Sequence, residues 1–213
     1  LREELLGLGL VGVDVHVTGN PVFDELLPRA GDSARRERLR ADLGLGERKV
    51  VLWPSPAAIH SPRFDRPFLT PGQLVAAFEP FCRSHPQFAY LLRPHPNAPY
   101  SLPPGAENGV LDPGLSARDA LLVADMVCTE LSTMGLQAAM RGLPVVCVGY
   151  GAEAIYPSYG LAHCVDTLDE ALRLLAAGER ATGFPKGALP PAGTAVPAIL
   201  DVMRGLTPSS SAL

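Results

Sequence analysis

The most regular feature of the chain is an alternation of short apolar runs with longer segments in which apolar residues recur at helical spacing. The apolar runs are rich in Val, Leu and Cys, and they are short enough for strands that are buried on both faces. They occupy residues 49–53, 88–92, 110–111, 124–128, 145–148 and 162–165. Strands that alternate with helices in this way form a parallel sheet.

The segments between these runs predict helices with recognisable starts and ends. Pro71-Gly72 opens one helix, Ser116 and Ser132 can cap two others, and Gly142 closes the second of these. The predicted helices cover residues 33–43, 71–83, 117–123, 134–141, 168–177 and 196–204. We therefore predict an α/β fold, a Rossmann-like three-layer α/β/α domain whose parallel sheet is covered on both faces.

Three stretches depart from the alternation. Residues 54–71 hold five prolines and predict a long loop, and residues 178–197 are rich in Gly, Ala and Pro and predict an irregular surface passage. The first residues look like the end of a helix followed by an extended piece, so we expect a fragment of a longer protein. The predicted organisation is the end of an interdomain connection at 1–18, a Rossmann-like domain at 19–205 and a flexible tail at 206–213.

Composition and charge narrow the class of protein. A chain of 213 residues that is 47% hydrophobic and 19% charged can bury a full core as one domain. The formal net charge of −4 argues against an extended basic surface for nucleic acid. No signal-like segment or apolar run of about 18 residues occurs, so we expect a cytoplasmic protein with no transmembrane segment. The four cysteines lack metal-like spacing, so we expect reduced thiols and no metal site.

The segment from Cys128 to Cys147 carries the first candidate chemistry. Ser132 and Thr133 stand at a predicted helix start directly after a strand, where unpaired backbone N–H groups and the helix dipole favour an anion such as phosphate. Gly135 in the first turn would let a ligand approach the backbone closely. An ordinary crossover with Ser132 as a plain helix cap explains the same residues, so the segment alone leaves both interpretations open.

Further polar residues follow other predicted strands. In a doubly wound sheet, ligands bind at the carboxyl ends of the strands. Arg93 can offer a planar fork to a phosphate, and His95 can take up or release a proton near neutral pH. Together these strand ends predict a phosphate-ester site. The polar residues at them are Ser55, Arg93, His95, Asn97, Asp112, Glu130, Ser132 and Thr133.

Several short motifs along the chain resemble a known family. Val17-Thr-Gly-Asn-Pro21, the His95-Pro-Asn97 loop, and Ser132-Thr-Met-Gly-Leu-Gln-Ala-Ala followed by Gly142-Leu-Pro-Val-Val occur in the order seen in the C-terminal half of GT-B nucleotide-sugar enzymes. The resemblance is in particular to UDP-N-acetylglucosamine 2-epimerases and related surface-carbohydrate glycosyltransferases, over about residues 13–177. It implies two Rossmann-like domains that face a cleft, with this chain as the C-terminal domain of the GT-B fold. That domain would hold a nucleotide diphosphate without an obligatory metal.

The resemblance also implies roles and partners. Ser132, Thr133 and Gly135 match the helix start that binds the diphosphate, and His95 and Asn97 match a His-x-Asn motif whose histidine belongs to the active site. His95 is therefore the candidate catalytic residue, and the others are candidate ligand-binding residues together with Arg93, Ser55 and Gln137. The implied partners are a missing N-terminal domain of the same protein and a small-molecule nucleotide sugar, which is the substrate; no cofactor is implied. A homodimer is compatible with the sequence.

Two departures from the family pattern bear on the activity. Gln137 stands where the family commonly has a carboxylate that holds the ribose hydroxyls, and a neutral amide makes weaker hydrogen bonds there. Residues 53–60 stand where the epimerases usually carry a His-Arg pair. The second departure favours a transferase or an unassigned relative over a strict epimerase.

These observations lead to one expectation and two alternatives. We expect the nucleotide-sugar-binding half of a GT-B-type glycosyltransferase or UDP-GlcNAc 2-epimerase-like enzyme of carbohydrate biosynthesis, in which the helix start and Arg93 stabilise a departing diphosphate. The first alternative is a relative of the CDP-glycerol or polyol phosphotransferases, which would prefer cytidine nucleotides. The second is a non-catalytic Rossmann-like binding module, which would bind no nucleotide.

Overall fold

The computed structural model describes residues 7, 14–56, 67–149, 160, 162–179 and 193–206. The chain divides into two compact units, of which the larger is Pro28–Pro185 and the smaller joins Leu1–Leu27 with Lys186–Leu213. The boundaries predicted at residues 18 and 205 stay predictions. Most of the predicted helix at the start of the chain, and most of the two predicted loops at 54–71 and 178–197, lie outside the described residues.

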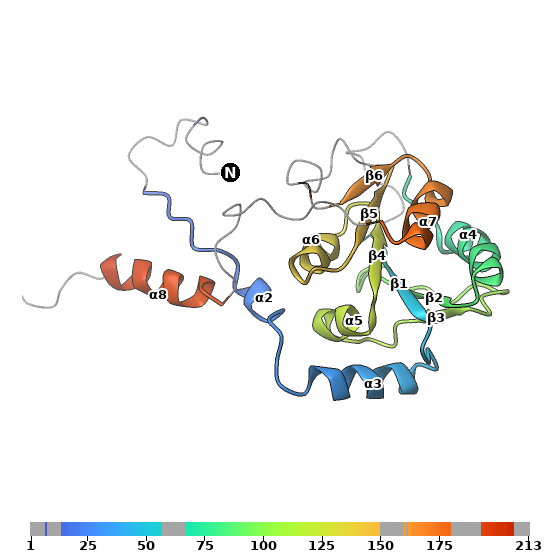
Figure 1. The fold of residues 1–213 in the computed structure, drawn as a ribbon. Helices are drawn as coiled ribbons and strands as arrows, with labels where there is room; N and C mark the ends of the chain where they lie inside the picture. Colours follow the sequence, from blue (N-terminus) through green and yellow to red (C-terminus); the bar gives the residue numbers. More distant parts are fainter. Residues whose placement is uncertain are drawn as a thin grey trace, which may run out of the picture. The chain divides into compact units, whose positions relative to one another are not determined.

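The larger unit is built on a six-stranded sheet in which every recorded strand pairing is parallel (Figure 1). The strand order is β3-β2-β1-β4-β5-β6, so the chain builds outward from β1 on one side, returns, and continues from β4 on the other. This arrangement confirms the predicted parallel sheet. The strands are β1 Lys49–Pro54, β2 Phe88–Arg93, β3 Gly109–Leu111, β4 Met126–Thr129, β5 Val145–Val148 and β6 His163–Val165.

Helices cover both faces of this sheet, which confirms the predicted three layers (Figure 1). One face packs against α4 and α7, and their apolar side chains form a single cluster with those of the strands. The other face carries α5 and α6, with α3 packed on α5. The helices of the larger unit are α3 Asp32–Asp42, α4 Pro71–Ser84, α5 Ala117–Val123, α6 Thr133–Met140 and α7 Leu168–Ala177.

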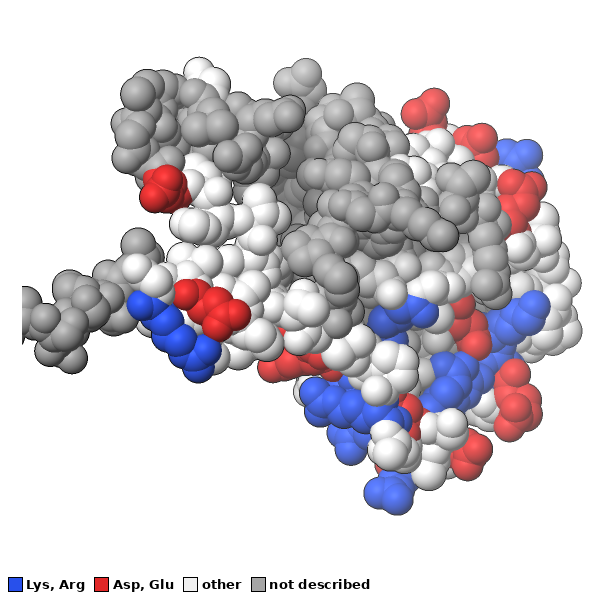
Figure 2. Space-filling view, turned by 60° about the vertical axis from the view of Figure 1, so that its left-hand side comes forward, with Lys and Arg blue, Asp and Glu red and all other residues white. Residues whose placement is uncertain are grey.

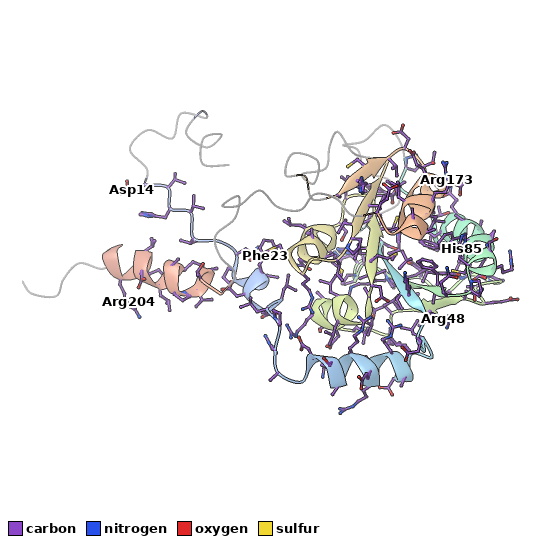
Figure 3. The ribbon with its side chains drawn as sticks, viewed as in Figure 1. Asp14, Phe23, Arg48, His85, Arg173 and Arg204 are labelled. Carbon is purple, nitrogen blue, oxygen red and sulfur yellow. The ribbon has the colours of Figure 1, made fainter. Side chains whose placement is uncertain are left out.

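Aromatic side chains dominate the core beneath α4, and side chains fill the space between sheet and helices (Figure 3). Phe78 stacks on Tyr90 with ring centroids 4.9 Å apart, and Trp53 meets Phe78 edge to face at 6.3 Å. The Tyr90 hydroxyl donates to the Glu79 carboxylate at 2.7 Å, which satisfies both groups although Glu79 is only 3% exposed. A Cβ at position 109 would lie 2.2 Å from the Tyr90 ring, so only glycine fits there.

The arginines of α3 hold this helix against α5 and form ion pairs with acidic residues. Arginines at 35, 36, 38 and 40 are typical of a solvated helix face, yet Arg40 is only 9% exposed. Arg40 donates to the carbonyl of Val123 at 2.8 Å, and Arg36 donates to that of Ala124 at 3.0 Å. These bonds satisfy carbonyl groups at the end of α5 that have no partner within the helix. Figure 2 shows the same interleaving of basic and acidic side chains on the face that it draws.

The smaller unit contains α2, Pro21–Asp24, and α8, Ala195–Leu206. The sequence predicts α8 within two residues at either end, but it does not predict the single turn of α2. Asp24 joins the two segments, because its Oδ1 accepts the backbone N–H of Gly193 at 2.7 Å. In the part of the chain that the structure describes, no helix is long and apolar enough to span a membrane.

Candidate functional site

The polar residues predicted at the strand ends lie along one edge of the sheet. Arg93 ends β2, Ser55 follows β1, and Ser132 follows β4 by two residues. These three strands are neighbours, and their order reverses between β1 and β4. In doubly wound sheets this reversal opens a crevice at the carboxyl ends, where ligands bind. The fold therefore brings Ser55, Arg93 and Ser132, which are far apart in the sequence, to the edge of the sheet at which such a ligand would lie.

The start of α6 is the part of this edge that best fits an anion. The Ser132 hydroxyl caps the helix by accepting the Met134 N–H at 3.3 Å, and the Ser132 carbonyl accepts the Gly135 N–H at 3.0 Å. The Thr133 N–H donates to no group within the described residues, and its hydroxyl is exposed. Ser132 therefore has the role of an ordinary cap, while Thr133 presents a free N–H and a hydroxyl at the positive end of the helix dipole.

Gln137 lies one turn further along α6 and is 7% exposed. Its side-chain oxygen Oε1 is buried without a hydrogen-bond partner. Leaving such an oxygen unpaired costs roughly 1–3 kcal/mol, and unpaired polar atoms of this kind gather at functional sites. Gly135 is buried as well. The contacts predicted from the sequence for Gln137 with a ribose and for Gly135 with a diphosphate stay predictions.

Arg93 is anchored by a carboxylate to which the sequence analysis assigned no role. Its Nη1 donates to Asp112 and to the carbonyl oxygen of Leu115, the second at 2.8 Å. The Asp112 side chain is 1% exposed, whereas that of Arg93 is 20% exposed. The positive charge of Arg93 is thus already paired, although part of the guanidinium still reaches the surface.

The turn after β2 fixes the tautomer of His95. The His95 Nδ1 accepts the backbone N–H of Asn97 at 3.2 Å, and the His95 carbonyl accepts the N–H of Ala98 at 2.9 Å. Since Nδ1 accepts a hydrogen bond, the proton of the neutral ring is on Nε2. His95 is therefore set to donate a hydrogen bond from Nε2. The side chain of Asn97 is exposed.

Ser55 is held by a tyrosine that the sequence analysis did not identify. The two hydroxyls of Ser55 and Tyr100 lie 2.8 Å apart, and the Ser55 N–H donates to the carbonyl of Arg93 at 2.9 Å. Burial raises the pKa of the Tyr100 hydroxyl, and the bond to Ser55 only partly opposes this shift. Tyr100 therefore stays protonated near neutral pH and can donate to Ser55 or to a ligand.

Glu130 is a further buried carboxylate at this edge. It directly follows β4, is 4% exposed and accepts the backbone N–H of Leu69 at 3.1 Å. Its own carbonyl oxygen accepts the Cys147 thiol at 2.8 Å. The sequence places Glu130 and Asp112 at strand ends, but only the fold reveals that Glu130 meets Leu69, 61 positions away, and that Asp112 meets Arg93, 19 positions away.

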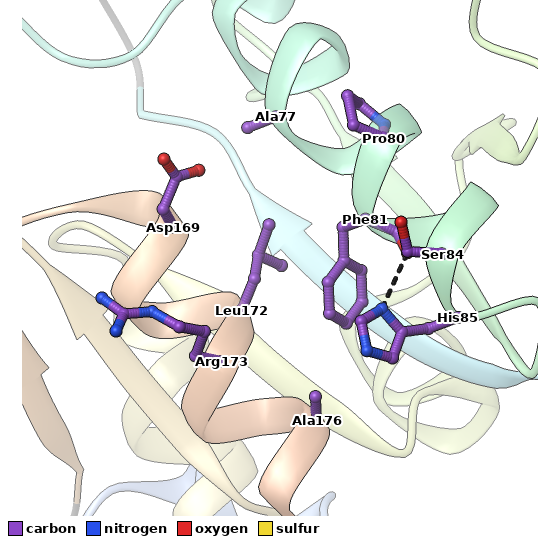
Figure 4. A pocket seen from close by; sticks show the side chains of 9 residues that line it. All are labelled: Ala77, Pro80, Phe81, Ser84, His85, Asp169, Leu172, Arg173 and Ala176. Atoms are coloured by element: carbon purple, nitrogen blue, oxygen red, sulfur yellow. Dashed lines mark hydrogen bonds between the residues drawn. The ribbon is translucent and has the colours of Figure 1, made fainter.

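A groove lies outside this edge of the sheet. A groove of about 370 Å³ lies between α4 and α7, where the Phe81 and His85 rings stack at 4.6 Å opposite Leu172 (Figure 4). It is lined largely by apolar side chains. Within the described ranges, no group of three or more His, Cys, Asp or Glu side chains could hold a metal ion.

Solved structures with the same fold include enzymes of nucleotide-sugar chemistry. The UDP-GlcNAc 2-epimerase of Methanocaldococcus jannaschii, in complex with UDP-GlcNAc and UDP, is 12% identical with a TM-score of 0.63 over 96% of this chain and 58% of that one. A putative UDP-N-acetylglucosamine 2-epimerase of Listeria monocytogenes is 19% identical, with a TM-score of 0.61 over 96% of this chain and 56% of that one. The wall teichoic acid polymerase TagF is 18% identical, with a TM-score of 0.55 over 76% of this chain and 42% of that one.

These comparisons establish the fold that the sequence predicts. No protein-family model matches the chain, and no curated protein has a matching sequence. The chain spans between 42% and 58% of the length of these three solved structures. The Rossmann-like α/β fold predicted from the sequence is therefore confirmed.

Proposed function

We propose that this chain binds the diphosphate part of a nucleotide sugar, as the nucleotide-binding half of a GT-B-type glycosyltransferase or epimerase-like enzyme. The observation that carries the proposal is the position of α6. Its amino end directly follows β4, one of the two strands between which the sheet order reverses. The crevice at such a reversal and the unpaired N–H groups of a helix start both favour a phosphate.

The site residues contact different parts of the ligand. Thr133 and the start of α6 hold the diphosphate, Arg93 adds a charged contact from β2, and Gln137 offers the amide of a buried side chain to the ribose. Charge develops on the diphosphate as it departs, and fixed N–H donors stabilise that charge without reorganising. His95 follows the neighbouring strand β2 and donates a hydrogen bond from Nε2 to the sugar.

A transferase is favoured over an epimerase by the groups present. An epimerase needs an acid and a base on opposite faces of the sugar, and His95 supplies one titratable group. Transfer needs mainly stabilisation of the departing diphosphate, which the start of α6 and Arg93 would supply. The partner domain and a role in carbohydrate biosynthesis belong to this proposal and are supported by the fold shared with the sugar-nucleotide enzymes. A cytoplasmic location is part of the same proposal.

The likeness to wall teichoic acid polymerase favours a second candidate function. That fold match covers 76% of the chain. It supports the alternative that this chain is a relative of the polyol phosphotransferases and binds a cytidine nucleotide. The two candidates differ in the base, since the first expects uridine nucleotides to bind more tightly and the second expects cytidine nucleotides to do so.

Thermal melts with nucleotides test the proposal. Ligand at about 100 times its dissociation constant adds roughly 2.7 kcal/mol to the free energy of unfolding, so UDP at millimolar concentration should raise the melting temperature. Free N-acetylglucosamine is the control and should cause no shift. A larger shift with CDP than with UDP would support the second candidate. The absence of a shift with UDP, CDP, GDP and dTDP would contradict both candidates.

A further inference from the structure

Asp112 lies beside the candidate site in one fixed orientation. It follows β3, and its Oδ1 accepts the backbone N–H groups of Gly114 at 2.9 Å and of Leu115 at 2.6 Å. Its Oδ2 accepts the Nη1 of Arg93. With a side chain that is 1% exposed, the carboxylate is placed by the turn that leads from β3 to α5.

The guanidinium of Arg93 is held at one nitrogen only. Nη1 donates both to Asp112 and to the Leu115 carbonyl, whereas Nε and Nη2 donate to no group within the described residues. These two nitrogens form the edge of a guanidinium that binds two oxygens of a phosphate side by side. The side chain is 20% exposed, so this second edge is open to a ligand.

We propose that Asp112 is a positioning residue, which holds Nη1 so that the Nε and Nη2 edge of Arg93 is fixed for a nucleoside diphosphate. The inference rests on the proposed function, because it places that anion at the carboxyl end of β2. A free arginine side chain loses conformational entropy when it binds a ligand. An arginine that is already anchored has lost part of that entropy on folding and binds more tightly.

Calorimetric titration of UDP into four variants tests this role. Asp112→Asn keeps an oxygen for Gly114 and Leu115 but removes the charge that anchors Arg93, so UDP should bind roughly tenfold more weakly than to the wild type. In an Arg93→Gln background the same change should cause no further loss, because Asp112 acts through Arg93. The matched control is Asp119→Asn, which breaks a 2.6 Å ion pair with Arg35 on α3 and should leave UDP affinity unchanged.

A spectroscopic signature separates positioning from a structural role. In NMR spectra of the free protein, the protons on Nη1 of Arg93 should give a resolved signal in the wild type and lose it in Asp112→Asn, because the anchored guanidinium is released. If Asp112→Asn does not fold, Arg93→Lys replaces it, since lysine keeps the charge without the fork and should also weaken UDP binding roughly tenfold.

The outcomes distinguish this inference from the proposed function. Wild-type UDP affinity in Asp112→Asn, or an unchanged Arg93 signal, would overturn the positioning role and leave nucleotide binding intact. A further loss of affinity in the Arg93→Gln background would also overturn it. If the wild type binds neither UDP nor CDP, both proposals are wrong.

Discussion

At the scale of single residues, the candidate site is built from side chains that are each held in place by a partner. Asp112 anchors Arg93, Tyr100 meets Ser55, and the backbone of Asn97 sets the tautomer of His95. The sequence identifies Arg93, Ser55 and His95, because Arg, His and Ser after a strand stand out. It does not identify their supports, since a hydrogen bond between residues 45 positions apart, as for Ser55 and Tyr100, leaves no local signal.

The pairing of Arg93 changes what its removal should do. The sequence alone suggests that Arg93→Ala weakens nucleotide binding and leaves stability unchanged. The structure predicts that this variant is destabilised by roughly 3 kcal/mol, because it leaves the carboxylate of Asp112 buried without its charged partner. Thr133→Ala should differ, since its hydroxyl is exposed, and it should weaken UDP binding with little loss of stability. Urea unfolding of both variants measures the difference, and equal stability would contradict the role given to Asp112.

The buried carboxylate of Glu79 predicts a dependence of stability on pH. Burial raises its pKa, but hydrogen bonds from Tyr90 and from Asn108, the latter at 2.8 and 3.0 Å, outweigh burial and hold the pKa below its ordinary value of 4.5. Because the folded-state pKa is lowered, this stabilisation is present above pH 4.5 and is lost as pH falls through the folded-state value.

Glu79→Gln should therefore cost stability near pH 7, by roughly 1–3 kcal/mol, because the glutamine NH₂ would face the Asn108 NH₂. The cost should shrink as the pH is lowered, since the protonated glutamate of the wild type also loses its ionic bonds. Denaturant unfolding between pH 7 and pH 3 compares the two proteins. A difference that stays constant over this range would show that Glu79 does not ionise differently in the folded chain.

At the scale of elements, α3 shows why composition misleads about exposure. Its arginines look like a solvated face, yet Arg40 donates to the carbonyls of Gly46 and Val123, at 2.9 and 2.8 Å, and stays buried. Arg36 donates to the carbonyl of Ala124 at 3.0 Å. The helix is held by hydrogen bonds from its arginines to the carbonyl groups at the end of α5. A pattern of hydrophobic residues does not reveal such contacts. By contrast, α4 follows its sequence signals closely, because Thr70 and Gln73 form a reciprocal cap at its start.

Arg40→Lys tests this account of α3. A lysine offers a single ammonium group to carbonyls that the flat guanidinium reaches together, so at least one of them stays unpaired. We expect a loss of roughly 2 kcal/mol in the free energy of unfolding. Arg38→Lys on the exposed side of the same helix is the matched control and should lie within about 0.5 kcal/mol of the wild type. Equal effects of the two changes would show that α3 docks by other contacts.

At the scale of the whole molecule, the sequence predicts more of the fold than of the site. The alternation of apolar runs with capped helices predicts every strand of the sheet and its parallel direction, because short apolar strands and helical crossovers leave few other arrangements. The strand order, which places the reversal between β1 and β4, depends on pairings between distant segments such as Val51 with Met126. That reversal selects which strand ends form one site, so the site becomes visible only with the sheet.

The last prediction concerns what the chain can do alone. Its site offers donors for a diphosphate, and at least 42% of the length of each of the three solved structures of this fold lies outside the match. We expect this chain to bind UDP and to turn over no nucleotide sugar by itself, because an acceptor and its base have to come from elsewhere. Product analysis by chromatography after incubation with UDP-GlcNAc checks this. The His95→Ala variant should bind UDP as tightly as the wild type, because the His95 side chain is expected beside the sugar. Release of UDP from UDP-GlcNAc by the unmodified chain would contradict the prediction, since it would show that these 213 residues hold all the catalytic groups.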